Sequence, residues 1–374
     1  MSEPVVSFTQ RLLQTPSPSR KEIELAKIVV AEMINLGYDE AYIDDAGNAV
    51  GLIRGRKEGP GWLLLTHLDH VDVGDEANWP YPPFSGKVDD RGRLWGRGAV
   101  DIKGPLAATV YGAAAALAAG QPPRDVWVAS VVEEELGGGG ASHLIPELKD
   151  RIAAAVIAEP SSLQVIYGHR GVARVRLIFQ GSPHHAALSR SADNPNYQLA
   201  RFLERLAVIQ RPRDRVLGAS SITPTILKAD TTSANRTPGK VILILDWRTV
   251  GETPEEMREL LEYLTRGMNV SIEVPPLWEH GELENTPGVR TDPDHPLVLQ
   301  MEKVRRRVVG PGPRPGLWAF ATDGRYTHAA GLPTAGFGPG DPTLAHTEHE
   351  YIELNQLLAG TRYYAALVQE DPAV

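Results

Sequence analysis

Histidine and acidic residues occur in this chain where apolar segments end. His67 follows the segment WLLLT, Glu159 follows AAAVIA, and His346 lies in a loop after GFGPGD. The chain has no cysteine, so thiolate ligands are excluded and any bound metal must be held by His, Asp or Glu. Imidazole and carboxylate groups at such positions indicate metal-assisted hydrolysis as the candidate chemistry.

Two aspartates have both a functional and a structural interpretation. His67 and Asp69 lie two residues apart at the end of a predicted strand, so their side chains point to the same side. A carboxylate that holds the second ring nitrogen of a histidine orients that histidine as a metal ligand, although Asp69 can equally cap a turn. Asp101 follows LWGRGAV and precedes a helix that Pro105 helps to start, where helix capping is the simpler role for an isolated aspartate.

Three consecutive glutamates, Glu133, Glu134 and Glu135, end a predicted buried strand and run into LGGGGAS. Adjacent buried carboxylates repel one another and lose hydration, and a metal cation would offset both effects. The alternative is a solvated loop, which is the usual place of a charge run. Because alternate strand residues face opposite sides, one glutamate can bind metal while its neighbour faces substrate. The glycines do not belong to a phosphate-binding G-x-x-x-x-G-K-[ST] motif, which is absent.

The elements that position these residues follow the order of an α/β protein. Apolar segments of strand length, WLLLTHL, DVWVASVV and IAAAVIA, alternate with helical segments, which predicts an open, mostly parallel sheet with helices on both faces. Ser19 and Glu22 form a capping box before a predicted helix that ends near Gly37. Open α/β sheets bind ligands at the carboxyl ends of their strands, so we expect the histidine and acidic groups to converge there.

A different pattern starts near Gly171. VARVRLIFQG and KVILILDWR are typical of strands, whereas NYQLARFLERLAVI and TPEEMRELLEYLTRG are typical of helices, with Thr253 as an N-cap. At 374 residues the chain is long enough for two domains. We therefore predict an α/β domain of residues 1–171 and 281–374, interrupted by a small α+β domain of residues 172–280.

Composition excludes several classes of partner. The formal net charge of -9 argues against a basic surface for nucleic acid. No apolar run approaches the roughly 20 residues that span a bilayer. The N-terminal segment MSEPVVSFTQRLLQ lacks the basic start and long apolar stretch of a secretory signal. We therefore expect a cytoplasmic protein without nucleic-acid or membrane partners.

Together these segments resemble the M20 family of metallopeptidases and amidohydrolases, which includes acetylornithine deacetylase, succinyl-diaminopimelate desuccinylase and carboxypeptidase G. The resemblance covers nearly the whole chain, from SPSRKE and DDAGNAVG to AHTEHEYIEL. Within the family, NWPYPPFSGK, LWAFATDGR and GFGPGDPTLAHT are most similar to a branch of selenium-metabolism-linked hydrolases. The resemblance implies a zinc-peptidase-like catalytic domain, an inserted lid and dimerisation domain, and a homodimer.

The resemblance also implies a centre of two Zn²⁺ ions, with Co²⁺ or Mn²⁺ as possible substitutes. Each ion would have three protein ligands, and one aspartate would bridge both. The first ion would be held by His67, Asp101 and Glu159, and the second by Asp101, Glu135 and His346.

The remaining residues implied by the resemblance act on water and substrate. Asp69 would orient His67, and Glu134 would be the general base, although a slip of one residue along the glutamate run would move that role to Glu133. In IFQGSPHHAA, His185, with His184 as the alternative, would stabilise the oxyanion in the partner subunit's active site.

Two further segments of the predicted lid resemble those that hold a substrate carboxylate. ANRTP and LDWR assign this role to Asn235 and Arg248. Without the resemblance, Arg248 would be interpreted as a surface charge at the end of a strand.

The resemblance implies a dinuclear metal-dependent hydrolase that cleaves the amide bond of an N-acyl amino acid, as deacetylases and desuccinylases do. A dipeptidase or carboxypeptidase that acts on a short peptide is the alternative within the same family. Outside enzymes, the alternative is a noncatalytic homologue that binds a metabolite. Such a homologue would lack a ligand or the base, and the chain has them all. Fold and motifs alone leave the acyl group and the amino acid open.

Overall fold

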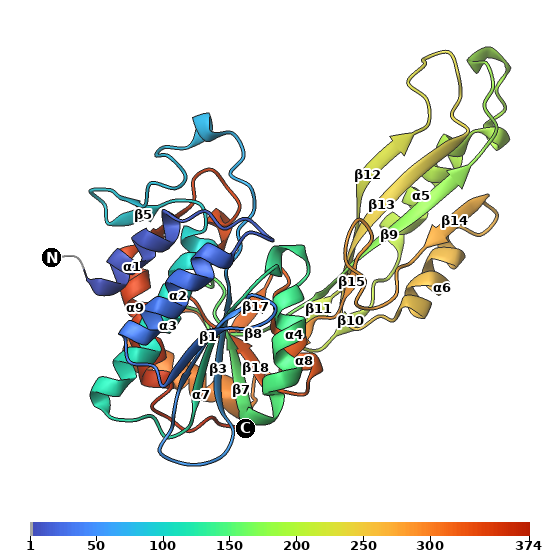
Figure 1. Ribbon diagram of the computed structural model, residues 1–374. Helices are drawn as coiled ribbons and strands as arrows, with labels where there is room; N and C mark the ends of the chain where they lie inside the picture. Colours follow the sequence, from blue (N-terminus) through green and yellow to red (C-terminus); the bar gives the residue numbers. More distant parts are fainter. Residues whose placement is uncertain (1–2) are drawn as a thin grey trace. The chain divides into compact units, whose positions relative to one another are not determined.

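The computed structural model describes residues 3–374 and divides the chain into two compact units (Figure 1). Unit 1 is the chain up to Gly168 and from Val289 onward, and unit 2 is the segment His169–Gly288. The predicted second boundary, 280/281, lies eight residues earlier than the observed one, 288/289. The difference arises because β15 (Asn285–Thr286) pairs with β9 (Gly171–Gln180) of unit 2.

Unit 1 is built on a mixed sheet with the strand order β1-β2-β6-β3-β7-β18-β8-β16, and β17 pairs with β8. The central strands β6, β3, β7 and β18 are parallel, whereas β1 pairs antiparallel with β2, β2 with β6, and β8 with β18. The predicted α/β fold is confirmed. The strands are β1 (Glu40–Ile43), β2 (Ala49–Ile53), β3 (Gly61–His67), β6 (Val126–Val131), β7 (Ile152–Ile157), β8 (Ile166–His169), β16 (Val289–Arg290), β17 (Gly316–Trp318) and β18 (Thr334–Gly336).

Helices cover both faces of this sheet, with α3 and α9 on one side and α4 and α8 on the other (Figure 1). Trp62 and Leu64 of β3 pack into the core with α1, α2, α3, α7 and α9, whereas Leu63 and Leu65 pack toward α4, because successive strand residues face opposite sides. The helices are α1 (Pro4–Leu13), α2 (Ile23–Asn35), α3 (Gly104–Ala116), α4 (Gly139–Leu148), α7 (Pro296–Val308), α8 (Gly324–Ala329) and α9 (Leu354–Leu367).

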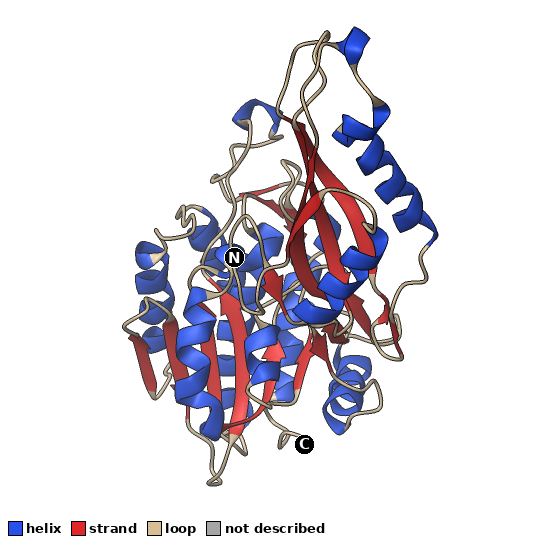
Figure 2. Ribbon diagram, turned by 90° about the vertical axis from the view of Figure 1, so that its right-hand side faces the viewer, coloured by secondary structure: helices blue, strands red, loops and turns tan. Residues whose placement is uncertain are grey.

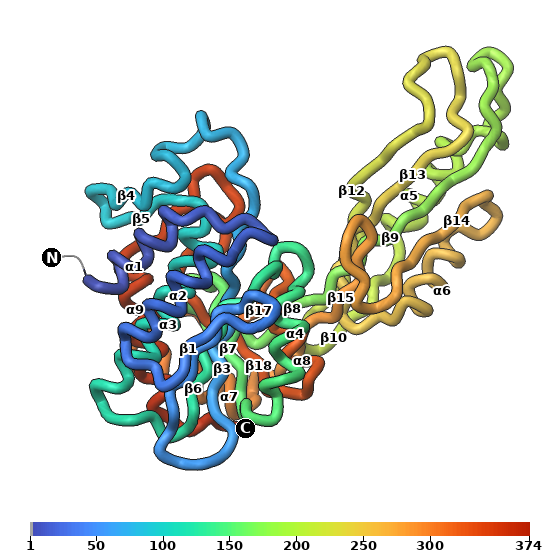
Figure 3. Tube along the Cα trace, viewed as in Figure 1, coloured from blue at the N-terminus to red at the C-terminus, as the bar shows by residue number. Residues whose placement is uncertain are grey.

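The helical stretch Ala99–Ala119, which is kinked at Asp101, is long and apolar enough to cross a membrane by length and composition alone. It is the core helix of unit 1, because 67% of its most apolar window is buried and α3 packs along α9. Figure 3 shows that α9, near the C-terminal end of the chain, lies beside α1 and α3. A separate small sheet, β19-β5-β4, consists of β4 (Lys87–Val88), β5 (Arg93–Trp95) and β19 (Tyr351–Glu353).

Unit 2 has the small antiparallel sheet and the two helices predicted for the insertion (Figure 2). Its strand order is β12-β13-β9-β14, and α5 and α6 pack on one face through Phe202 and Leu261 against Leu177 and Leu245. Thr253 caps α6, as predicted, and the structure shows in addition that it forms a capping box with Glu256. The further elements are α5 (Pro195–Val208), β10 (Arg213–Asp214), β11 (Gly218–Ala219), β12 (Ser221–Ala229), β13 (Lys240–Thr249), α6 (Pro254–Leu264) and β14 (Val270–Glu273).

The capping box predicted for α2 is wrong. Glu22 occupies the N-cap position with helical backbone angles and without a side-chain cap. Ser19 Oγ instead donates to Asp69 Oδ2 at 2.7 Å, and Glu22 Oε1 accepts from the backbone N of Glu133 at 3.1 Å. Both residues of the pattern therefore bind segments that are distant in sequence, because these tertiary partners outcompete the local ones.

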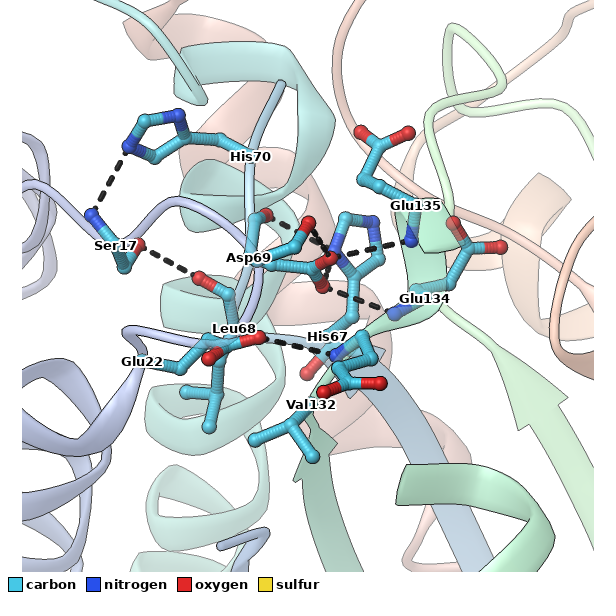
Figure 4. A network of polar contacts seen from close by, with 12 residues as sticks. Ser17, Glu22, His67, Leu68, Asp69, His70, Val132, Glu134 and Glu135 are labelled. Atoms are coloured by element: carbon cyan, nitrogen blue, oxygen red, sulfur yellow. Dashed lines mark hydrogen bonds and ion pairs between the residues drawn. The ribbon is translucent and has the colours of Figure 1, made fainter. Parts of the chain in front are cut away.

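His70 is buried after β3 and fastens the loop that precedes α2 (Figure 4). Its Nε2 accepts from the backbone N of Ser17 at 3.0 Å, and its Nδ1 lies 2.7 Å from the carbonyl oxygen of Val71. Burial, followed by the nearby charge of Lys103, lowers the pKa of His70 to about 4. The fold therefore holds this imidazole in its neutral form.

We expect His70 to make the protein less stable as the pH falls. The unfolded histidine titrates near pH 6.5, so between about pH 6.5 and pH 4 the unfolded chain binds a proton that the folded chain does not. The free energy of unfolding should fall by roughly 2 to 3 kcal/mol over this range. His70→Gln keeps a donor and an acceptor but does not titrate, so urea unfolding should show a flatter pH dependence for the variant. Parallel pH curves would contradict the assignment.

Candidate metal centre

Asp101 lies between two histidines that come from distant parts of unit 1. His67 is the last residue of β3, Asp101 lies in the π-helical turn Ala99–Lys103 before α3, and His346 lies in the loop before β19. Asp101 Oδ1 is 2.9 Å from His67 Nε2, and Asp101 Oδ2 is 3.2 Å from His346 Nε2. One carboxylate therefore presents one oxygen to each imidazole. A carboxylate that bridges two cations uses its two oxygens in the same way.

Each histidine also faces a second carboxylate. Glu159 Oε1 lies 3.5 Å from His67 Nε2, and Glu135 Oε1 lies 2.9 Å from His346 Nε2. Ligand atoms of His67, Asp101 and Glu135 all lie within 4.8 Å of one another. The structure thus brings all five predicted ligand residues together, in two groups that share Asp101.

Strand ends account for only part of this convergence. His67, Glu135 and Glu159 follow the parallel strands β3, β6 and β7, as predicted. Asp101 does not, because it follows β5 of the separate small sheet and enters the site on the turn that starts α3. His346 likewise lies in a loop and has a left-handed φ of 64°. The prediction that all these residues end parallel strands is therefore wrong for Asp101.

Asp69 orients both His67 and the glutamate turn (Figure 4). Its Oδ1 lies 3.2 Å from His67 Nδ1, and its two oxygens accept from the backbone N of Glu134 at 3.1 Å and of Glu135 at 3.2 Å. Burial alone would raise the pKa of Asp69, but the hydrogen bond and charge of His67 lower it. Asp69 therefore contacts a histidine and also accepts from the backbone of a turn, and its role in orienting a metal ligand stays a prediction.

The three consecutive glutamates occupy different environments. Glu133 has a left-handed φ of 58°, and its Oε1 lies 3.5 Å from Arg20 Nε. Glu134 and Glu135 instead line a cavity of about 230 Å³, and Glu133 does not. The other residues that line this cavity are Asp101, Glu159, Phe320, Ala321, Pro342, Ala345 and His346.

Burial of several carboxylates dominates the electrostatics of the site. Burial, followed by the charge of Asp323, raises the pKa of Glu134 well above its ordinary value. Burial likewise raises the pKa of Glu135 and, more strongly, of Glu159. Burial would do the same to Asp101, but hydrogen bonds from the two histidines lower the pKa of this carboxyl.

The pKa values of the two histidines are also raised, but the cause is the neighbouring carboxylates and not burial. Hydrogen bonds to Asp101 and Glu135 raise the pKa of His346 to about 10. Burial alone would lower the pKa of His67, but the charge of Glu159 and hydrogen bonds to Asp101 and Asp69 raise it well above the ordinary value. The cluster therefore attracts positive charge to the space between these groups, and its nitrogen and oxygen donors suit Zn²⁺, Co²⁺ or Mn²⁺.

Asp323, between β17 and α8, is a buried carboxylate of the site that the sequence did not reveal. Burial raises its pKa to about 6, and its Oδ1 lies 3.4 Å from Arg325 Nη2. A Cβ atom on residue 138 would lie 2.2 Å from Asp323 Oδ1, and Gly138 has a φ of 81°. Glycine is therefore required at this position of the LGGGGAS run, because a side chain would collide with Asp323 and because the backbone is left-handed.

Unit 2 holds the other three predicted residues, in two separate places. His185 and Asn235 are exposed and lie on adjacent loops, where the backbone N of Ala186 donates to Asn235 O at 2.8 Å. Arg248 lies near the end of β13, where its guanidinium binds Asp246 at 2.8 and 3.2 Å. With a rise of about 3.3 Å per residue, β13 separates Arg248 from the Asn235 loop by roughly 25 Å. Unit 2 of one chain therefore does not bring Asn235 and Arg248 together.

The sequence profile of peptidase family M20/M25/M40 matches residues 63–370. The chain belongs to this family. It is a metal-dependent hydrolase of peptide or amide bonds. The predicted resemblance to the M20 family is thus confirmed, and the narrower branch stays a prediction.

Relatives of this M20 protein match nearly its whole length. The uncharacterized protein YgeY of Escherichia coli is 26% identical over 384 aligned residues, which cover 96% of this chain and 92% of YgeY. The M20 metallo-carboxypeptidase Sso-CP2 of Sulfolobus solfataricus has a TM-score of 0.79 at 18% identity, with 100% of both chains covered. YxeP of Bacillus subtilis, described as a dinuclear metal-binding M20 peptidase, has a TM-score of 0.71 at 16% identity, covering 98% of this chain and 96% of YxeP. These structures share the fold.

Proposed function

We propose that this M20 protein cleaves the amide bond of an N-acyl amino acid, in the manner of a deacetylase or desuccinylase, with two Zn²⁺ ions. The observation that carries this proposal is the position of Asp101. Its two oxygens face His67 and His346, and it lines one cavity with His346 and Glu134. When bound, the two cations polarise the scissile carbonyl and lower the pKa of the attacking water. The dinuclear description of YxeP supports this stoichiometry.

Glu134 is the proposed general base. It lines the cavity beside Asp101, and Asp69 fixes its backbone through the hydrogen bond to its N–H. Burial raises the pKa of this carboxyl toward the range in which a group exchanges protons efficiently near neutral pH. Glu134 takes a proton from the attacking water and delivers it to the leaving nitrogen as the C–N bond breaks, which yields a carboxylic acid and an amine.

The cavity of unit 1 supports a small substrate. Its volume of about 230 Å³ is below the roughly 300 to 1,000 Å³ of typical ligand pockets, and its wall includes the apolar residues Phe320, Ala321, Pro342 and Ala345. A short peptide is the second candidate substrate, and the likeness to the carboxypeptidase Sso-CP2 favours it. Both substrates end in a free carboxylate, which Arg248 and Asn235 would bind.

We also propose a homodimer in which unit 2 is the lid and dimerisation domain. β12 is an edge strand with exposed apolar residues, including Ile226 and Leu227. An edge strand of this kind favours pairing with a second copy. In such a dimer, His185 and Asn235 of one subunit would act on the site of the other.

Hydrolysis of a panel of N-acetyl amino acids, N-succinyl amino acids and dipeptides tests the proposed function. We expect a chelator to stop turnover and Zn²⁺ to restore it. Glu134→Gln should retain bound metal but lower kcat by about 10² to 10⁴-fold, because the general base is lost. Glu133→Gln is the matched control and should stay close to wild type. Wild-type turnover by Glu134→Gln, or the same loss in Glu133→Gln, would refute the assignment.

Arg248→Ala should raise KM for substrates with a free carboxylate. Hydrogen bonds to a charged group contribute roughly 1.5 to 3 kcal/mol, which corresponds to an increase of about 10- to 100-fold. The same substrates with an amidated carboxyl group are the control, and their KM should be equal for variant and wild type. An unchanged KM for the free acids removes Arg248 from substrate binding.

Mixed dimers test the role of His185 across subunits. His185→Ala and Glu134→Gln should each be nearly inactive alone. After unfolding and refolding together, half of the dimers are mixed, and each mixed dimer has one site with both residues intact. The mixture should therefore recover about a quarter of wild-type activity. A mixture that stays inactive, or a fully active monomer in sedimentation, excludes the role of His185 in trans.

A further inference from the structure

Glu350 is a fully buried carboxylate that binds the turn on which Asp101 lies. Its exposed fraction is 0%. Its Oε2 accepts from the backbone N of Gly98 at 3.0 Å, and its Oε1 accepts from the backbone N of Val100 at 2.9 Å and of Asp101 at 3.1 Å. One side chain thus holds three backbone N–H groups at the start of the π-helical turn, where the backbone angles of Asp101 are non-helical.

Arg97 neutralises Glu350 and connects it to the loop of His346. Its Nη1 donates to Glu350 Oε2 at 2.7 Å and to the carbonyl oxygen of Thr347, the residue after His346, at 3.2 Å. Its Nε donates to the carbonyl oxygen of Asp72 at 3.1 Å. Counting side-chain atoms alone, the exposed fractions are only 3% for Arg97 and 1% for Glu350. The ion pair therefore joins the turn of Asp101 to the loop of His346.

A buried ion pair elsewhere in unit 1 makes a different set of contacts. Glu302 and Arg305 are both buried, and the carboxylate of Glu302 binds Arg305 and Arg306 on the same helix, α7. That pair spans one turn of helix. The Glu350–Arg97 pair instead crosses between two loops, each of which bears a proposed ligand.

We propose that Glu350 is a positioning residue that holds Asp101 and His346 in register for the second cation. This inference rests on the proposed dinuclear function. His67 and Glu159 come from β3 and β7, and Asp69 orients His67, so their support is independent of Glu350. Asp101 and His346 both lie outside the parallel strands, and the Glu350–Arg97 pair links their backbones.

Because of where the Glu350–Arg97 pair lies, loss of Glu350 should affect the affinity for the two cations unequally. The second cation would take Asp101 and His346, both of which Glu350 positions, whereas the first would take only Asp101 from this pair of loops. Outer partners that orient metal ligands change metal affinity by about 10- to 100-fold. Loss of Glu350 should therefore weaken the second equivalent by this factor and leave the first within a few-fold of wild type.

Metal binding without turnover tests the inference. Metal-free protein is titrated with Zn²⁺ in competition with a chromophoric chelator, and with Co²⁺ monitored by its visible absorption. Wild type should bind two equivalents. Glu350→Gln, which keeps the volume but places an amide NH₂ where an acceptor is needed, should bind the second equivalent about 10- to 100-fold more weakly. Glu302→Gln, which removes a buried carboxylate of the other pair, should bind both equivalents as wild type does.

Thermal unfolding of the metal-free proteins separates positioning from general stability. Glu350→Asp retains the charge next to Arg97 but is one methylene shorter, so it should fold and still lose the second equivalent selectively. It decides the matter if Glu350→Gln does not fold. The inference fails, and the proposed function stands, if Glu350→Asp binds both equivalents with wild-type affinity. The same holds if Glu302→Gln weakens the second equivalent as much as Glu350→Gln does. A wild-type protein that binds no Zn²⁺ overturns the proposed function and the inference with it.

Discussion

The burial of negative charge around Asp101 is the constraint on which the site depends. Asp101, Glu135 and Glu159 lie within 3.5 Å of imidazole nitrogens and are largely removed from water. Buried carboxylates are unfavourable unless cations or hydrogen-bond donors offset them. The histidines supply some of this compensation. Burial raises the pKa of Glu159, and hydrogen bonds to two carboxylates raise the pKa of His346. Divalent cations held by the same atoms supply more, and this links the fold of unit 1 to metal-dependent hydrolysis.

Two kinds of support hold these charges in place. His67, Glu135 and Glu159 follow strands of one parallel ladder, whose backbone hydrogen bonds fix the ends of β3, β6 and β7 relative to one another. Asp101 and His346 arrive on a turn and a loop next to the separate antiparallel pair of β5 and β19, and the side chains of Glu350 and Arg97 tie these two segments further. Asp69 completes the first kind of support, because it binds His67 and the backbone after β6. The residues of the proposed centre are therefore held by different kinds of contact.

The sequence predicted the parts of this site that depend on local pattern. The ends of apolar segments located His67, Glu135 and Glu159. In unit 2, Thr253 was predicted as a helix cap because it comes directly before a helical pattern, and the structure confirms this cap. Ser19 shows the limit of such reasoning, since a correct capping-box pattern is overridden by Asp69, fifty residues away. Asp323 and Glu350 are single acids in loops, and their burial depends on distant partners such as Gly138 and Arg97. Family resemblance, and not periodicity, supplied the bridging role expected of Asp101.

The arrangement within unit 2 bears on how a substrate carboxylate would be bound. His185 and Asn235 lie on neighbouring loops and form one surface, whereas Arg248 lies near the opposite end of β13 and is bound to Asp246. One carboxylate is far smaller than the length of this strand, so it cannot touch both places in a single copy of unit 2. A dimer with twofold symmetry would contain two copies of Arg248 and two copies of the His185–Asn235 surface. Each site could then use Arg248 of one subunit and the His185–Asn235 surface of the other. We therefore propose that Arg248 and the His185–Asn235 surface, if they meet at one substrate, come from two chains, which makes substrate recognition depend on assembly.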